Sequence, residues 1–219
     1  MAALRLAHRG DFRAGPENSL AAMQAALANP RCDGLEFDIR ISADGVPILN
    51  HDVTLERLHG RPEAVDALTA AELADLGIAT LDEVLATAPA SAFLDIELKC
   101  QPSPSVREAI ARHRPDDDGR TIVSSFEPDV LRTIATERWP WPRWGNSPIL
   151  LPFVIETAQE LGCSALSVDW HAIDAAAADA VRSGGLGLAA WTVRDRDEFE
   201  RLDAMGVVAV CVEAEALDG

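Results

Sequence analysis

Short apolar runs alternate along the chain with longer stretches in which apolar residues recur every three or four positions. The short runs have the length of strands, and the longer stretches have the period of amphipathic helices. Such alternation is typical of repeated βα units, which build a parallel sheet. Seven strands are predicted, at Leu4–His8, Gly34–Ile41, Ala92–Lys99, Thr121–Ser124, Ser164–Asp169, Gly187–Val193 and Val207–Val212.

Helices are predicted between these strands. The entry Pro16-Glu17-Asn18 offers a polar cap for the first of them, and Thr69 followed by Glu72 is a capping box for a short one. The main predicted helices are Asn18–Ala28, Asp82–Ala88, Glu127–Glu137, Phe153–Leu161, Ala172–Ser183 and Asp195–Met205.

An eighth strand would have to lie around Trp139–Leu151, where three prolines blur any period. Because proline cannot donate to a strand ladder, this strand is expected to be short or irregular. Residues 115–119, with three successive aspartates, are expected to form a solvated loop. No linker marks a boundary, so the 219 residues are expected to form one domain, 1–219, within the size range of the smaller α/β barrels.

The formal net charge is -17, which argues against nucleic acid as a partner and against an anionic membrane surface. An acidic protein that handles an anionic substrate needs a local positive charge, such as a bound divalent cation. The four cysteines are widely spaced and are expected to be reduced, and no apolar stretch has the length of a membrane span. A cytoplasmic protein is the simplest expectation, and the oligomeric state stays open.

Two neighbouring strands direct carboxylates to one face. In Gly34–Ile39, Glu36 and Asp38 alternate with apolar residues, and in Phe93–Lys99 the polar face holds Asp95, Glu97 and Lys99. One interpretation is a structural ion-pair core, for example Glu36 with Arg40 and Glu97 with Lys99. The favoured interpretation is a metal site, because buried acids are costly without a bound positive charge, and an all-oxygen set suits Mg²⁺ or Ca²⁺ better than zinc.

Two of the five histidines occupy loop positions just past strand ends. His8 closes the first strand and precedes Arg9, while His51 follows the apolar run Val46–Leu49 and precedes Asp52. A lone histidine is usually structural, but this pair is a candidate for a general base and a general acid. The ends of barrel strands are where catalytic groups collect, which supports the assignment. No role is assigned to the other three histidines.

These motifs resemble the ordered motifs of the glycerophosphodiester phosphodiesterase family almost from end to end. The matching segments are His8-Arg9-Gly10, Pro16-Glu17-Asn18-Ser19, Glu36-Phe37-Asp38, Asp44-Gly45, His51-Asp52, Thr80–Leu85, Glu97-Leu98-Lys99, Ser125-Phe126 and Trp191-Thr192-Val193.

The resemblance implies a compact (β/α)8 TIM barrel with one divalent cation, Mg²⁺ or Ca²⁺ with Mn²⁺ as a further candidate. It implies that Glu36, Asp38 and Glu97 are metal ligands, that His8 and His51 transfer protons, and that Arg9 and Lys99 bind phosphate. Phe126 and Trp191 match positions that line the substrate cavity, although such aromatic residues are as often core. Asp169 is a weak further candidate for the cleft.

The implied substrate is a small-molecule phosphodiester, cleaved to glycerol 3-phosphate and an alcohol, with attack by the substrate's own 2-hydroxyl as one route. Three features depart from the family pattern. The inserted cap domain after His51 must be reduced or absent, since about thirty residues separate His51 from Leu81. Cys211-Val212-Glu213 stands where Thr-Asp is common, and Trp139–Pro148 is unusual. Neither of the last two is expected to affect the metal or proton-transfer residues.

Two alternatives stay open beside the ion-pair core. One is a related lipid phosphodiesterase of the lysophospholipase D or sphingomyelinase D type, which would need an apolar surface for an acyl chain. The sequence has no exposed amphipathic helix or basic membrane patch, so a water-soluble diester is favoured. The other is a barrel that binds a phosphoester without turnover, although a protein of that kind is expected to have lost a histidine or a ligand.

Overall fold

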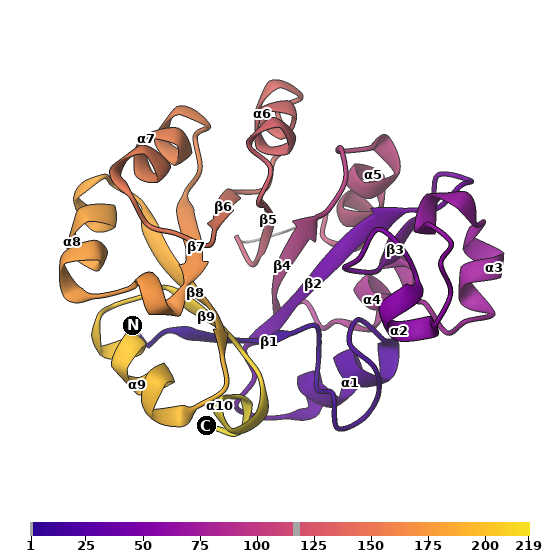
Figure 1. The fold of residues 1–219 in the computed structure, drawn as a ribbon, viewed down its shortest axis with the longest axis horizontal. Coiled ribbons are helices and arrows are strands. Elements are labelled where there is room, and N and C mark those ends of the chain that lie inside the picture. The colour runs from indigo at the N-terminus through magenta and orange to yellow at the C-terminus, as the bar shows by residue number, and fades with distance from the viewer. Residues whose placement is uncertain (1, 116–118) are drawn as a thin grey trace.

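Eight parallel strands close into a barrel in the computed structural model, which describes residues 2–115 and 119–219 (Figure 1). The sheet order is β1-β9-β8-β7-β6-β5-β4-β2, and β1 pairs with β2 to complete the ring. The predicted (β/α)8 TIM barrel is confirmed. Its strands are β1 (Leu4–His8), β2 (Gly34–Ile41), β4 (Phe93–Leu98), β5 (Thr121–Ser125), β6 (Arg143–Ser147), β7 (Ala165–Asp169), β8 (Gly187–Val193) and β9 (Ala209–Val212).

The eighth strand lies where the sequence placed it. Strand β6 is five residues long and pairs in parallel with both β5 and β7. It is short, as expected, and its prolines at 140, 142 and 148 flank the ladder, so each missing N–H falls outside it. The aspartates 116–118 of the expected solvated loop lie outside the described residues.

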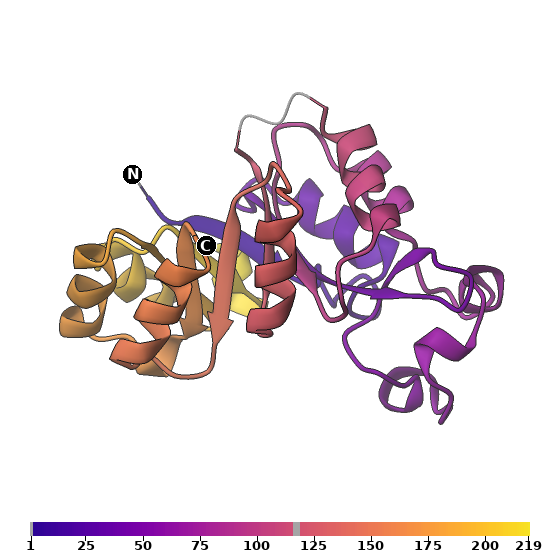
Figure 2. The same cartoon turned by 90° about the horizontal axis from the view of Figure 1, so that it is seen from above.

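Helices surround the barrel, as the two perpendicular views show (Figures 1 and 2). Helix α5 is not among the elements that the sequence pattern predicted. Its first position is Pro104, where a missing N–H costs nothing, and Ser103 caps it by accepting from the amide of Val106. The surrounding helices are α1 (Leu20–Ala28), α4 (Leu81–Thr87), α5 (Pro104–His113), α6 (Pro128–Thr136), α7 (Pro152–Glu160), α8 (Ala175–Ser183), α9 (Arg196–Ala204) and α10 (Ala214–Asp218).

A small lobe takes the place of a cap domain. Strand β3 (Pro47–Leu49) runs antiparallel to the end of β2, and the elements α2 (Glu56–His59), η1 (Val65–Ala67) and α3 (Ala70–Ala74) follow it. The lobe has its own apolar cluster, built from Ile48, Leu55, Val65, Leu73 and Ile78. The expectation of a reduced cap is therefore confirmed.

The core forms two layers. Outward-facing strand residues such as Leu35, Phe37 and Ile96 pack against the helices, and a smaller cluster that includes Phe93 and Trp144 fills the barrel. This filling leaves the C-terminal ends of the strands as the open end. All four cysteines are free, as expected. Among the described residues, no helix has the length and apolar character that crossing a membrane requires.

Candidate active site

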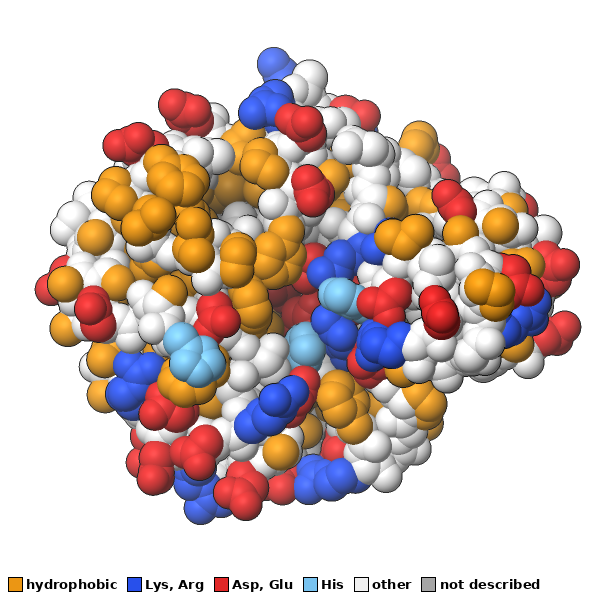
Figure 3. Space-filling model, viewed as in Figure 1, with side chains coloured by type: hydrophobic (Ala, Val, Ile, Leu, Met, Phe, Trp, Pro, Cys, Tyr) orange, Lys and Arg blue, Asp and Glu red, His pale blue; other side chains and the backbone are white. Residues whose placement is uncertain are grey.

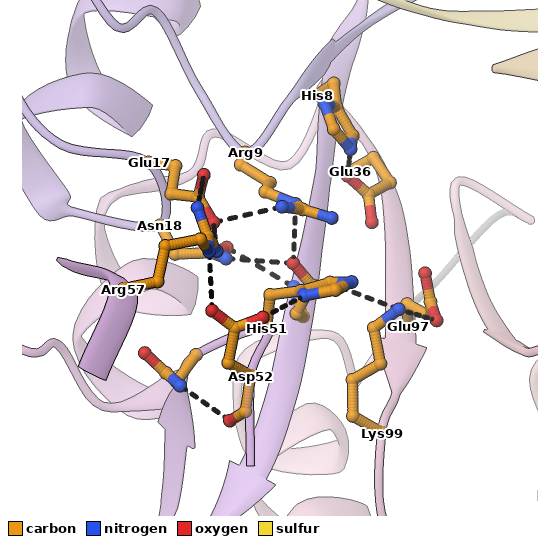
Figure 4. Close-up of polar contacts among 12 residues, drawn as sticks. His8, Arg9, Glu17, Asn18, Glu36, His51, Asp52, Arg57, Glu97 and Lys99 are labelled. Atoms are coloured by element: carbon orange, nitrogen blue, oxygen red, sulfur yellow. Dashed lines mark hydrogen bonds and ion pairs between the residues drawn. The ribbon is translucent and has the colours of Figure 1, made fainter. Parts of the chain in front are cut away.

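Three carboxylates from two adjacent strands meet at the C-terminal end of the barrel (Figure 4). Glu36 and Asp38 lie on β2, and Glu97 pairs with Asp38 from β4. All three are buried, and one oxygen of each lies within 4.8 Å of the others. Glu36 Oε2 has no hydrogen-bond partner among the described residues, and Asp38 Oδ1 and Glu97 Oε1 both contact the ammonium of Lys99. One lysine cannot neutralise this group of buried carboxylates, so the set fits a divalent cation.

The acidity of the three carboxyl groups supports this fit. Burial raises the pKa of Glu97 to about 7 and the pKa of Glu36 well above its usual value, and the charge of Asp38 adds to both shifts. Burial also acts to raise the pKa of Asp38, but Arg9 and Lys99 outweigh it and hold that pKa below its usual value. The positive charge of Arg9 and Lys99 thus keeps the pKa of one carboxyl group low but does not offset the burial of the other two.

Asp95 lies one layer deeper, on β4 beside Glu36. Burial raises the pKa of Asp95 to about 7, although Ser124 donates a hydrogen bond to it at 2.5 Å. Asp95 shares the inward face that the sequence predicted, but it is not one of the three residues whose oxygens converge.

Two cations contact the carboxylates. Arg9 Nε lies 2.8 Å from Asp38 Oδ2, and Lys99 Nζ lies 3.3 Å from Asp38 Oδ1 and also contacts Glu97. Of the ion pairs that a structural core would use, the Glu97–Lys99 pair is present. Arg40 instead donates to the carbonyl oxygens of His51 and Lys99. The ion-pair interpretation therefore accounts for only part of the cluster.

The residues before α1 do more than cap it. Ser19 is the N-cap, and Asn18 has a positive φ of 59°. Asn18 Nδ2 donates to Asp38 Oδ2 at 2.9 Å, and Glu17 accepts from Arg9 at 3.0 Å. The predicted polar cap at residues 16–18 is thus wrong in its role, because Asn18 binds Asp38 and Glu17 binds Arg9 and Arg57 (Figure 4).

His8 is oriented by a residue at the far end of the chain. Its Nδ1 lies 2.5 Å from Glu213 Oε1, and Arg194 Nε donates to Glu213 Oε2 at 2.7 Å. Burial acts to raise the pKa of Glu213, but these two partners outweigh it and lower the pKa. Cys211-Val212-Glu213, which departs from the family pattern, was expected to leave the candidate proton-transfer residues unaffected. That expectation is wrong, because Glu213 contacts His8 directly.

His51 reaches the same pocket by another route. The strand before it, β3, is not a barrel strand, because it folds back antiparallel along β2 and pairs Leu49 with Ile39. This reversal returns His51 to the level of the carboxylates. Its Nδ1 lies 2.7 Å from Asp52 Oδ1, and burial lowers the pKa of His51 below its usual value. An imidazole with a lowered pKa is neutral at pH 7 and able to accept a proton.

One pocket of about 170 Å³ brings these groups together. Phe126 and Trp191 form part of its wall, with their rings edge to face at 5.4 Å, and Lys99 Nζ lies 5.0 Å from the Phe126 ring. The predicted site residues that line the pocket are His8, Arg9, Glu36, His51, Glu97, Lys99, Phe126 and Trp191. Sequence reasoning missed Asn146 and Ser167, which also line it and carry no recognisable motif.

The weaker candidate and the unassigned histidines lie elsewhere. Asp169 caps η2 (Trp170–Ala172) and contacts His171 Nδ1 at 2.7 Å. His113 Nε2 contacts Asp82 at 2.8 Å. Asp169, His171 and His113 therefore take part in structural contacts outside the pocket.

The family model described as the glycerophosphoryl diester phosphodiesterase family matches residues 8–214. The chain belongs to this family. A glycerophosphodiester phosphodiesterase from Caldanaerobacter subterraneus subsp. tengcongensis is 26% identical to it, over 97% of this chain and 95% of the relative. The enzyme assignment made from the motifs is thereby confirmed.

Solved structures share the fold. A phosphodiesterase from Oleispira antarctica, solved in complex with the product sn-glycerol-3-phosphate, has a TM-score of 0.86 at 24% identity and aligns over 96% of this chain and 93% of its own. A glycerophosphodiester phosphodiesterase from Thermotoga maritima has a TM-score of 0.80 at 22% identity, over 100% and 96% of the two chains. This chain therefore has the same barrel fold as these two structures.

Proposed function

We propose that this family member hydrolyses glycerophosphodiesters to glycerol 3-phosphate and an alcohol by metal-assisted general acid-base catalysis. The observation that carries the proposal is that His8 and His51, each held at Nδ1 by a carboxylate, line one pocket with the buried acidic residues. The product bound in the Oleispira antarctica relative supports glycerol 3-phosphate as the phosphate-containing product.

Glu36, Asp38 and Glu97 would hold one divalent cation. Their hard oxygen donors favour Mg²⁺ or Ca²⁺, with Mn²⁺ as the third candidate. When bound, the cation supplies positive charge where the phosphate gains negative charge in the transition state. Asn18 holds Asp38 in place through its hydrogen bond at 2.9 Å.

Arg9 and Lys99 would bind the phosphate. Both line the pocket, and both are largely buried, with 14% of each side chain exposed. Fixed cations in a site with little water interact more strongly with a charge that develops during the reaction than exposed ones do. They therefore stabilise the transition state more than the ground state.

The two histidines would act as base and acid. One removes the proton of the attacking 2-hydroxyl of the substrate, and the other protonates the leaving alkoxide. Water then adds to the resulting cyclic phosphate and opens it to glycerol 3-phosphate, with the histidines exchanging roles. Glu213 contacts Nδ1 of His8, and Asp52 contacts Nδ1 of His51. Nε2 of each ring is therefore left for proton transfer. Glu213 and Asp52 are thus positioning residues. Phe126 and Trp191 would cover the substrate and exclude water.

The test is release of glycerol 3-phosphate from glycerophosphocholine and glycerophosphoethanolamine. Wild type and His51→Ala are compared in EDTA and then with Mg²⁺, Ca²⁺ or Mn²⁺ restored. Release by wild type that requires both the cation and His51 supports the proposal and identifies the ion. A folded protein whose melting temperature rises with the cation, yet which releases nothing from either diester, would contradict it.

A further inference from the structure

A second hollow, of about 180 Å³, opens beside the catalytic pocket between α6 and α7. Its walls are mainly apolar and include Leu131, Phe153, Val154, Leu161 and Leu166. We call this hollow the α6–α7 groove. It lies in the part of the molecule where orange side chains gather beside the central hollow (Figure 3).

The groove exists because the outward-facing residues on this side of the barrel are small. Ser125 on β5 pairs with Gly145 on β6, whereas on the neighbouring strands β4 and β2 the larger residues Leu98 and Ile39 pair. A Cβ added at Gly145 would lie 3.4 Å from Leu166 Cδ2, which is ordinary contact. Space that a larger side chain could fill has therefore been left open between the helices.

The groove and the catalytic pocket adjoin. Phe126 and Asn146 line both, and Phe126 together with Ser125 also lines a third hollow beside Lys99. Asn146 Oδ1 is buried and has no hydrogen-bond partner among the described residues, so it offers an acceptor to a ligand hydroxyl at the junction. A molecule with its phosphate beside Lys99 meets the groove directly past Phe126.

Large apolar side chains are exposed at the groove and next to it in the sequence. Of the eight exposed large apolar residues in the described part of the chain, Phe126 and Phe153 line the groove, and Ile149 and Leu151 belong to the segment between β6 and α7. Phe153 is 56% exposed. Apolar residues gathered beside a pocket in this way mark a surface that an apolar ligand covers.

We propose that the α6–α7 groove binds the hydrocarbon chain of the substrate. The substrate class is then a phosphodiester that carries an acyl or alkyl chain, either on the glycerol or on the leaving alcohol. This inference rests on the proposed function, since the phosphate must occupy the neighbouring pocket. Each methylene taken from water into the groove tightens binding about four-fold until the groove is filled.

Binding is tested first, because it does not require turnover. Alkylphosphocholines of increasing chain length are titrated calorimetrically, below their micelle concentrations and with the cation present. Affinity is expected to rise about four-fold per methylene for wild type. The rise should be lost in Gly145→Val, which fills the groove, and in Phe153→Glu, which places a charge at its rim.

Val208→Glu is the matched control, because Val208 is also exposed but precedes β9 at the opposite end of the barrel. It should keep the chain-length dependence. If Gly145→Val fails to fold, Phe153→Glu still tests whether the chain-length dependence of affinity comes from the groove. Equal affinity for all chain lengths in wild type overturns the inference, as does a concentration-dependent dimer that Phe153→Glu disrupts while chain binding is unchanged.

Turnover then identifies which part of the substrate carries the chain. Short-chain 1-acyl lysophosphatidylcholines place it on the glycerol, and glycerophosphoalkanols place it on the leaving alcohol. The series whose kcat/KM rises with chain length identifies the source. Chain-independent kcat/KM in both series, with glycerophosphocholine still cleaved, contradicts this inference and leaves the proposed function intact. Loss of the proposed function would instead appear as no release of glycerol 3-phosphate from glycerophosphocholine, glycerophosphoethanolamine or the glycerophosphoalkanols.

Discussion

Strands β1, β2 and β4 direct charged side chains to the open end of the barrel, whereas β5 to β8 direct small polar and aromatic ones. The first group supplies the three carboxylates, His8 and the two cations near them. The second supplies Asn146, Ser167 and Trp191. The α6–α7 groove also lies in this second half.

This difference separates two tasks. Under the proposed function, the charges that meet one phosphate and one cation have to lie close together, and three neighbouring strands carry them. Selecting the rest of the substrate depends on shape and apolar contact, and the other strands and their loops can vary without disturbing the charges. Changes in the first half should therefore reduce the rate, and changes in the second should alter substrate preference.

The largest effect is expected for Asp38→Asn. Asp38 is fully buried and contacts both Arg9 and Lys99, so its loss removes a proposed metal ligand and the carboxylate that orients these two side chains. We expect kcat/KM to fall about 1000-fold, the scale of losing a charge aimed at the transition state. The rise in melting temperature with divalent cations should also disappear.

Asp95→Asn is the control for this variant, because Asp95 is a buried inward carboxyl on β4 outside the converging three. It should retain cation-dependent stabilisation and most activity. Equal losses in both variants would show that the strands need buried negative charge in general.

His8→Ala and His51→Ala should each lower kcat by about 100-fold to 10,000-fold, the usual contribution of a positioned acid or base. Stabilisation by divalent cations should persist, since neither residue is one of the three converging carboxylates. His113→Ala, which removes only a contact with Asp82 on the outer helices, serves as the control. A comparable loss in the control would argue against the assignment.

Glu213→Gln should lower kcat roughly 10-fold to 100-fold with little change in KM, because the partner that orients the His8 ring is weakened. Glu213→Asp should recover part of the rate, and Glu215→Gln, on the exposed side of the same segment, should change nothing. An effect on KM alone would contradict a positioning role.

Phe126→Ala tests the second half of the barrel. Losing this ring should raise KM about 10-fold with a smaller change in kcat, since a phenyl group that becomes buried against bound substrate contributes on that scale to binding. Phe12→Ala removes a similarly exposed ring outside the pocket and is the control. A larger fall in kcat than in 1/KM would place Phe126 with the catalytic half.

The smallest expected effect is on how the free energy of unfolding depends on pH. Burial acts to raise the pKa of Glu213, but His8 and Arg194 outweigh it and lower the pKa. A depressed pKa stabilises the fold above the usual glutamate value, and this contribution is lost as pH falls through the depressed value. Wild type should therefore exceed Glu213→Gln by roughly 1–2 kcal/mol in free energy of unfolding at pH 7, and the gap should close in acid. Urea unfolding at several pH values measures it, and a gap that widens in acid would contradict the assignment.

Local pattern was enough to predict most of the fold. Strand periodicity located seven of the eight barrel strands, because alternation acts over a few residues. The position of β6 was inferred from the need for an eighth strand, since its flanking prolines blur the period. Helix α5 was not predicted, although its buried residues Val106, Ala109 and Ile110 have helical spacing. The sequence did not predict that β3 folds back along β2, because the choice of an antiparallel partner depends on tertiary packing.

By itself the sequence determined the family, the barrel and the converging acids of β2 and β4, since these follow from motif order and from the two-residue period of a strand. Only the tertiary structure decided that Glu213 orients His8, that Asn18 supports Asp38, and that small residues on β5 and β6 leave the α6–α7 groove open. His8 and Glu213 are 205 positions apart, and a contact of that kind forms only when the first and last strands pair to close the ring.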